Sequence, residues 1–164
     1  QRVEMPGIGI RPGAIRVAVL AFENTGRSAR YRFLERTIAD SVSTSLSRST
    51  NIAVVSRLAV DAKAAELATS GDSEGSNRAA LGWGARVGGA RGANAVIRGG
   101  FIEEADLLLV NYELLDIASA AIVSSQQVRG AVGATVFDLL DEVSAAVLRD
   151  VDAFNRSYRS QNGK

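Results

Sequence analysis

Three strand-like segments separated by very short connections constrain this fold more than any other feature of the sequence. The segments span residues 95–102, 107–117 and 121–129. In the middle segment Leu108, Val110, Tyr112 and Leu114 share one face, while Asn111 and Glu113 point the other way, as in a strand with one buried face. The connections, residues 103–106 and 118–120, have the length of hairpin turns. We therefore predict three consecutive antiparallel strands.

The first part of the chain alternates strand and helix patterns instead. Residues 15–22 and 51–55 are apolar and predict two mostly buried strands. Residues 29–48 predict a helix whose apolar stripe recurs every four residues, at Leu34, Ile38, Val42 and Leu46. A strand, a helix and a second strand in this order favour a parallel, right-handed crossover.

Three further helices are predicted. An alanine-rich helix over residues 58–68 has a candidate buried face made of Leu58, Ala62, Ala65 and Ala68. A glycine-containing segment, residues 77–92, retains a weaker helical rhythm. The last helix has the clearest pattern, with apolar residues at Val136, Leu140, Val143, Val147, Val151 and Phe154.

These elements predict an α/β (α+β) domain with a mixed parallel and antiparallel sheet of about five strands and helices packed on it. Residues 15–155 form the single domain. Residues 1–14 contain both prolines and are predicted to be a linker or irregular arm, and residues 156–164 are predicted to be a C-terminal tail.

Composition excludes several kinds of chemistry. The chain has no cysteine and no histidine, which removes thiolate and imidazole catalysis and Cys/His zinc sites. The net charge of +1 gives no global electrostatic argument for nucleic acid. No apolar run approaches the roughly 20 residues of a membrane span. We expect no catalytic residues, no metal, no cofactor and no nucleic-acid partner.

Four short motifs have weak functional interpretations. Gly71–Gly75 matches G-x-S-x-G but follows a helix, and Gly82–Gly84 lacks the third glycine of a dinucleotide loop. Both are predicted to be structural. Glu103, Glu104 and Asp106 are expected to form a solvated turn, and Asn155 begins a glycosylation triplet.

One turn is a candidate for anion binding. It lies between the first predicted strand and the first predicted helix, where a phosphate loop would occur. Its candidate residues are Asn24, Gly26, Arg27 and Arg30. The lysine and the first glycine of a true phosphate loop are absent.

Several segments, in their order, resemble the bacterial TolB amino-terminal-domain-like families. Residues 15–24, IRVAVLAFEN, resemble the opening strand, and residues 52–57, IAVVSR, resemble the second strand. Residues 92–99, GANAVIRG, and residues 114–116, LLD, are similar to the family's later strand and hairpin. Ala21 stands where the family has proline, and Ser119–Ala120 where it has glycine. These families include FlgO flagellar outer-membrane proteins, curli-secretion CsgG proteins and lipoprotein activators of penicillin-binding proteins.

The resemblance implies an anticodon-binding-like fold and a non-enzymatic role in the bacterial envelope. Such a protein is periplasmic or tethered to the outer membrane, with a lipid anchor upstream of Gln1 as one arrangement. It acts by binding a protein, through the sheet edges and the exposed faces of the first and last helices. A homo-oligomer is compatible with this role. The alternative is a regulatory domain of a signalling protein that binds a nucleotide or other small ligand.

Overall fold

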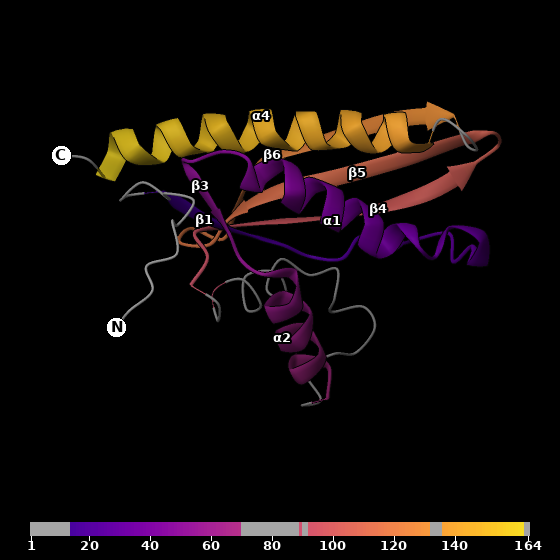
Figure 1. The fold of residues 1–164 in the computed structure, drawn as a ribbon, viewed down its shortest axis with the longest axis horizontal. Coiled ribbons are helices and arrows are strands. Elements are labelled where there is room, and N and C mark those ends of the chain that lie inside the picture. The colour runs from indigo at the N-terminus through magenta and orange to yellow at the C-terminus, as the bar shows by residue number, and fades with distance from the viewer. Residues whose placement is uncertain (1–13, 70–88, 90–91, 132–135, 163–164) are drawn as a thin grey trace, which may run out of the picture.

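A mixed sheet with helices on both faces forms the body of the protein (Figure 1). A computed structural model describes residues 14–69, 89, 92–131 and 136–162. In chain order the elements are β1 (Ile15–Val19), β2 (Glu23–Asn24), the 3-10 helix η1 (Ala29–Tyr31), α1 (Leu34–Ser47), β3 (Ile52–Val54), α2 (Arg57–Thr69), β4 (Ala95–Glu104), β5 (Leu107–Asp116), β6 (Ala121–Ala131) and α4 (Val136–Asn162).

The sheet has a parallel half and an antiparallel half. Its strand order is β3-β1-β4-β5-β6, and the short β2 pairs with β4 outside this path. β1 pairs in parallel with both β3 and β4, so the predicted parallel crossover is confirmed. β4, β5 and β6 pair antiparallel through two hairpins, which confirms the prediction for residues 95–129. The predicted fold class is therefore confirmed.

Two hydrophobic clusters lie on opposite faces of the sheet. α1 and α4 cover one face, here called the inner face, and α2 covers part of the other, the outer face (Figure 1). The larger cluster lies on the inner face and contains the four alternating residues of β5 predicted to be buried. It also contains the predicted stripe of α4, with Phe154 packed against its margin. The inner face is thus the main core.

The amino-terminal part of the predicted helix 29–48 has a different structure. Residues 29–31 form the 3-10 helix η1, and α1 begins only at Leu34. Tyr31 is buried in the inner cluster, and the amide of Arg32 bonds back to the carbonyl of Ala29 at 3.4 Å. The chain tightens there because the aromatic ring is drawn into the core before the regular helix begins.

The prediction of which face of α2 is buried is wrong. Leu58 is 80% exposed, whereas Val60 is 1% exposed and faces the outer cluster with Ala59, Ala64 and Leu67 packed around it. Alanine occurs on every side of this helix, so its faces differ little in hydrophobicity and the sequence does not identify the buried one. The orientation is set by Arg57, whose guanidinium donates a hydrogen bond to the carbonyl of Val19.

α4 is longer than predicted, because it continues past residue 155 to Asn162 into the predicted tail. Within the described ranges no helix is long and apolar enough to cross a membrane. The predicted arm, apart from Ala14, lies outside the described residues, as do the segment 70–88 and the two glycine motifs that begin in it. The division into arm, domain and tail stays a prediction.

Glycine is required at position 99 because β4 lies very close to β5 and to Phe22 there. A Cβ atom at this position would lie 2.1 Å from the carbonyl oxygen of Asn111 and 2.7 Å from the ring of Phe22. Backbone cannot yield as a flexible side chain can.

We expect Gly99→Ala to lower the free energy of unfolding by about 3 kcal/mol or more. Gly26→Ala is the control, since its Cβ would meet only Ile102 Cγ1, at 3.4 Å. Urea unfolding followed by circular dichroism measures both variants. Equal stability of the two variants would contradict the close packing of Phe22 on β4.

The β5–β6 turn contains a strained residue, because Ala120 has a φ of 55° in the left-handed region. An L side chain in this region costs about 1 kcal/mol, whereas glycine adopts it freely. We expect Ala120→Gly to raise the free energy of unfolding by about 0.5 kcal/mol after the entropic cost of glycine. Ala118→Gly in the same turn is the control, and thermal unfolding should show no gain for it.

Candidate functional site

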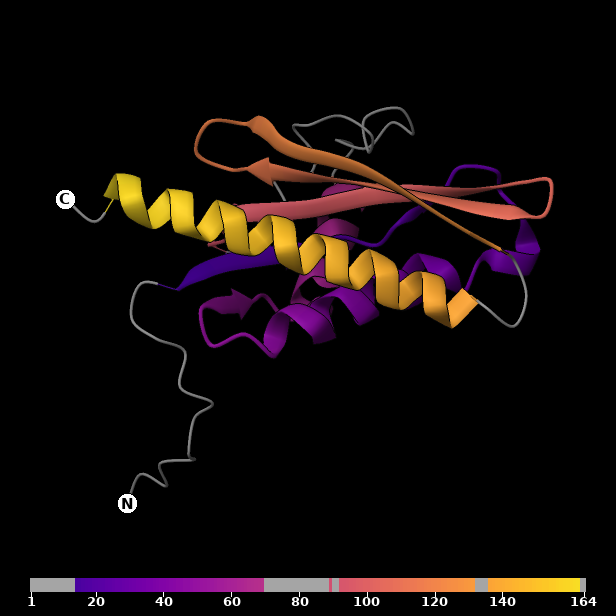
Figure 2. The same cartoon turned by 90° about the horizontal axis from the view of Figure 1, so that it is seen from above.

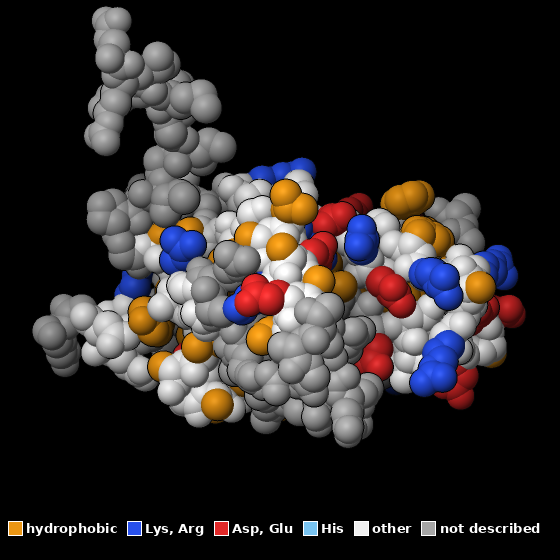
Figure 3. Space-filling view, turned by 90° about the horizontal axis from the view of Figure 1, so that it is seen from below, with side chains coloured by type: hydrophobic (Ala, Val, Ile, Leu, Met, Phe, Trp, Pro, Cys, Tyr) orange, Lys and Arg blue, Asp and Glu red, His pale blue; other side chains and the backbone are white. Residues whose placement is uncertain are grey.

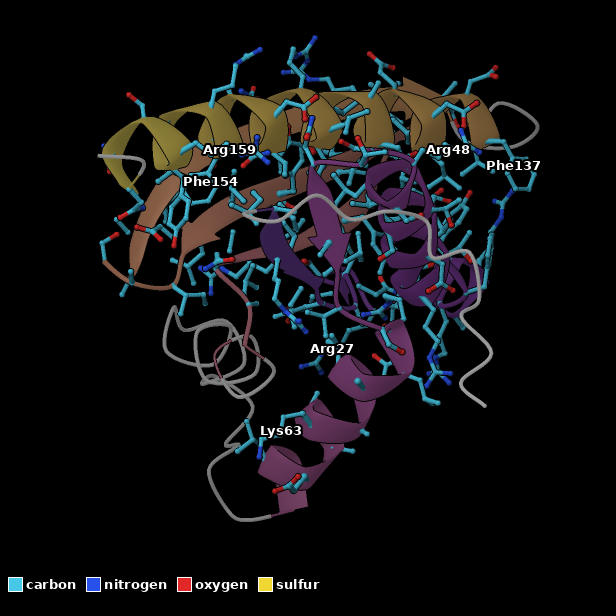
Figure 4. All side chains as sticks on the ribbon, turned by 60° about the vertical axis from the view of Figure 1, so that its left-hand side comes forward. Arg27, Arg48, Lys63, Phe137, Phe154 and Arg159 are labelled. Atoms are coloured by element: carbon cyan, nitrogen blue, oxygen red, sulfur yellow. The ribbon has the colours of Figure 1, made fainter. Side chains whose placement is uncertain are left out.

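The structure does not place the predicted anion-binding turn at the start of an α-helix. Within the described residues the turn is followed by the three-residue η1, and α1 begins later, at Leu34. The side-chain amide of Asn24 donates a hydrogen bond to the backbone carbonyl of Ser28 at 2.8 Å. The guanidinium of Arg30 lies 5.2 Å from the ring centroid of Tyr31. Figure 4 shows Arg27 well away from α4. Anion binding by Asn24, Gly26, Arg27 and Arg30 stays a prediction.

The switch point of the sheet is occupied by the chain's own side chains. In open α/β sheets, ligands bind beyond the carboxyl ends of parallel strands, where consecutive helices leave to opposite faces. Here these strands are β1 and β3, and Arg57 fills the position with a side chain only 14% exposed. Its guanidinium binds Asp40 at 3.3 Å, Asp61 at 3.1 Å and the carbonyl of Val19. This arrangement does not favour the small-ligand alternative.

The other predicted sites are located on structural elements. Glu103, Glu104 and Asp106 lie at the β4–β5 turn, and among the described residues no group of three or more acidic side chains could hold a metal ion. Asn155 is 4% exposed, and its side-chain amide donates a hydrogen bond to the backbone carbonyl of Asn51 at 3.1 Å. A buried asparagine within a helix is not accessible for glycosylation.

A groove between β6 and the carboxyl-terminal half of α4 is the candidate site. Its volume is about 440 Å³, and its strand residues lie near the β5–β6 turn at one end of the sheet. Figure 4 shows Phe154 extending from α4 at this end. The lining is partly apolar and partly polar, and consists of Leu114, Asp116, Val123, Ser124, Asp150, Ala153, Phe154, Ser157, Tyr158 and Gln161.

A β-bulge shapes the strand side of the groove. The register between β5 and β6 shifts between Leu114 and Leu115, which pair with Ser124 and Ile122. Val123 is left without a partner on β5 and lines the groove, 47% exposed. Bulges bend a strand and redirect its side chains, and they occur often beside functional sites.

Two aromatic side chains form the helix side of the groove. The rings of Phe154 and Tyr158, one helical turn apart, lie 5.9 Å from centroid to centroid. The hydroxyl of Tyr158 accepts a hydrogen bond from the Asn94 side chain at 3.3 Å, and Asn94 in turn accepts one from the backbone of Arg16 at 2.8 Å. The aromatic wall is therefore held from behind by β1 and the start of β4.

A shared carboxylate forms the floor of the groove. Asp150 accepts hydrogen bonds from the hydroxyl of Tyr112 at 2.6 Å and from that of Ser124 at 2.7 Å. Burial, and then the neighbouring Asp150, raises the pKa of the Tyr112 phenol above its ordinary value. Both hydroxyls are used to hold α4 against β5 and β6.

The lining favours binding over chemistry. Its two carboxylates are engaged, since Asp116 accepts from the Ser119 hydroxyl at 2.7 Å and Asp150 accepts the two hydroxyls described above. No lysine or arginine is among the described residues that line the groove. An apolar side chain is the group that such a surface accommodates. Sequence patterns did not reveal this site, because its residues come from three separate elements.

No protein-family model and no curated protein sequence matches this chain. Solved structures are similar in fold. The LpoB C-terminal domain from Salmonella enterica matches at 11% identity with a TM-score of 0.57, covering 73% of this chain and 84% of that chain. Lipoprotein GNA1162 from Neisseria meningitidis matches at 15% identity with a TM-score of 0.57, covering 84% and 96%.

TolB from Acinetobacter baumannii is a third similar structure. It matches at 16% identity with a TM-score of 0.51, and the match covers 92% of this chain but only 29% of the TolB chain. Identities this low show a shared fold, so the predicted TolB-like fold is confirmed. The resemblance to FlgO and CsgG proteins stays a prediction.

Because the phenol of Tyr112 is buried beneath the groove, we expect the free energy of unfolding to fall at alkaline pH. In the unfolded chain a tyrosine ionises near pH 10, whereas Tyr112 in the folded protein holds its proton to higher pH. Above about pH 10 the unfolded state therefore binds fewer protons than the folded state, and the free energy of unfolding falls as pH rises.

We expect Tyr112→Phe to weaken this alkaline loss of stability while lowering stability at pH 7 by about 2 kcal/mol, because Asp150 loses a hydrogen-bond donor. Urea unfolding at intervals between about pH 8 and pH 11.5 measures both effects. Ser124→Ala is the control, since it removes the other donor and keeps the phenol. Parallel pH profiles for the wild type and Tyr112→Phe would refute the assignment.

Proposed function

We propose that this chain is a non-catalytic module of the bacterial cell envelope that binds another protein through the groove between β6 and α4. The groove itself carries the proposal, since it combines exposed apolar and aromatic walls with carboxylates already bonded within the chain. Apolar surface lined by rigid aromatic side chains is typical of protein-binding sites. The expected ligand is an apolar side chain of the partner protein.

The absence of an equipped reaction centre supports a binding role. Two serines in the described part of the chain donate to groove carboxylates: Ser124 to Asp150, which Tyr112 also engages, and Ser119 to Asp116. A serine nucleophile needs a base that can take its proton, and the chain has no histidine. Asp150 holds α4 against the sheet, and Asp116 is bonded within the β5–β6 turn.

The envelope assignment rests on fold and on the sequence resemblance together. Among the similar structures, GNA1162 is a lipoprotein by name, and the resemblance in the sequence is to envelope families. We place this protein in the periplasm, or tethered to the outer membrane through a lipid anchor upstream of Gln1. Fractionation of cells that express the full gene tests this placement.

We expect Ala153→Arg to abolish partner binding, because the longer side chain fills the groove from the α4 side. Ala153 is exposed and lines the groove, so the substitution leaves the core unchanged. The tagged chain is used to capture and cross-link proteins from an envelope extract. A captured protein should fall at least tenfold with Ala153→Arg relative to the wild type.

Ala145→Arg is the matched control. Ala145 is also an exposed alanine of α4, but it is not among the groove residues. It should bind the same protein as the wild type. Equal capture by both variants, or a cytoplasmic chain with no groove-dependent partner, would overturn the proposal.

A further inference from the structure

An unprotected sheet edge carries an inference that goes beyond the proposed function. β6 spans 11 residues and ends the strand order, so within the described part of the chain it has a strand neighbour on one side only. Figure 2 shows β6 at the rim of the sheet across from β3. We infer that β6 pairs antiparallel with β6 of a second copy of this chain, so that two sheets join into one around a two-fold axis.

The edge lacks the features that normally prevent such pairing. Proteins protect an edge strand by keeping it short or by adding proline, lysine or other charges. β6 contains no proline and no lysine, and its single charged residue is Arg129. Its bulge at Val123 lies close to one end, so the stretch from Ser124 to Ala131 is regular. The opposite edge, β3, is protected because it has three residues.

The sequence of β6 is complementary to itself in an antiparallel register. Full overlap of its residues places Gln126 on the two-fold axis, opposite its own copy. Ser125 then faces Gln127 of the second copy, and Ser124 faces Val128. Arg129 faces Val123, so no like charges are opposed, which would destabilise the pair.

The charge distribution of α4 fits the same symmetry. The helix lies along β6, with Leu139 against Gly130 near one end and Asp150 bonded to Ser124 near the other. Its charged residues are all acidic in the amino-terminal half, at Asp138, Asp141 and Glu142. In the carboxyl-terminal half three arginines outnumber two aspartates. A two-fold axis at Gln126 places the half of one helix that carries three acidic residues beside the half of the other in which arginines outnumber aspartates, which favours a second copy as the occupant.

A cysteine on the axis tests the register. Directly opposed residues in antiparallel strands have Cα atoms about 4.5–5.5 Å apart, within the range that a disulfide spans. The chain has no native cysteine, so Gln126→Cys gives an unambiguous result. We expect mild oxidation to convert most of this variant into a covalent dimer. Ala65→Cys, at an exposed position of α2, is the control and should stay monomeric on a denaturing gel.

Paired charges test the association itself, by sedimentation equilibrium of the full chain. Ser125→Lys with Gln127→Lys opposes two lysine pairs across the axis, whereas Ser125→Lys with Gln127→Glu opposes two pairs of opposite charge. We expect the dimer dissociation constant of the first variant to exceed that of the second about tenfold. Both substituted positions are exposed, so we expect both variants to fold like the wild type.

Three results would overturn the inference. The first is a wild-type chain that stays monomeric up to about 1 mM. The others are equal dimer dissociation constants for the two charge variants, and equal amounts of covalent dimer for Gln126→Cys and Ala65→Cys. A monomeric wild type would leave the edge to an extended segment of a different protein. Loss of partner capture by Ala153→Arg would still support the proposed function in that case, so the two failures are distinguishable.

Discussion

The packing of one long helix on the antiparallel half of the sheet is the interaction on which the rest of the structure depends. α4 covers the inner faces of β5 and β6, where the apolar side chains of β5 and Val128 of β6 would otherwise be exposed. Its position is fixed at two points, because Leu139 fits against Gly130 and Asp150 binds the hydroxyls of Tyr112 and Ser124. Asp150 is partly buried, and these donors offset the cost of removing its carboxylate from water. The groove arises where α4 continues past this second point.

The two faces of the sheet differ in what they leave exposed. Among the described residues, α2 and the ion pairs of Arg57 with Asp40 and Asp61 cover the outer face at the parallel strands and beside Leu115 of β5. On the antiparallel strands the outer face carries the ion pair of Arg98 and Glu113, with 2.7 Å between the closest atoms. Figure 3 shows basic and acidic side chains interspersed on this side of the molecule. The described residues also include exposed apolar side chains outside the groove and β6, among them Leu58, Ile102 and Leu107, so charged and apolar groups are mixed on this face.

Periodicity was sufficient to predict the fold, because each main element has a strong local pattern. The alternation along β5 and the stripe along α4 determine which side chains are buried. α2 shows the limit of this approach, since alanine on all sides leaves its orientation to the long-range contacts of Arg57. The groove was not predictable for a similar reason. Asp150 and Tyr112 are 38 residues apart, and the bulge at Val123 depends on the register between two strands.

The internal use of polar groups explains how a chain of this composition can serve a binding role. Arg57, Arg98 and Asp150 each bond to other groups of the same chain, and these bonds hold α2, β4 and α4 in place. Polar side chains committed to the fold contribute little free energy to a ligand, because they would have to exchange one partner for another. Recognition then depends on surfaces that are still exposed in the single chain. Among the described residues these include the apolar walls beside Phe154 and the outer edge of β6.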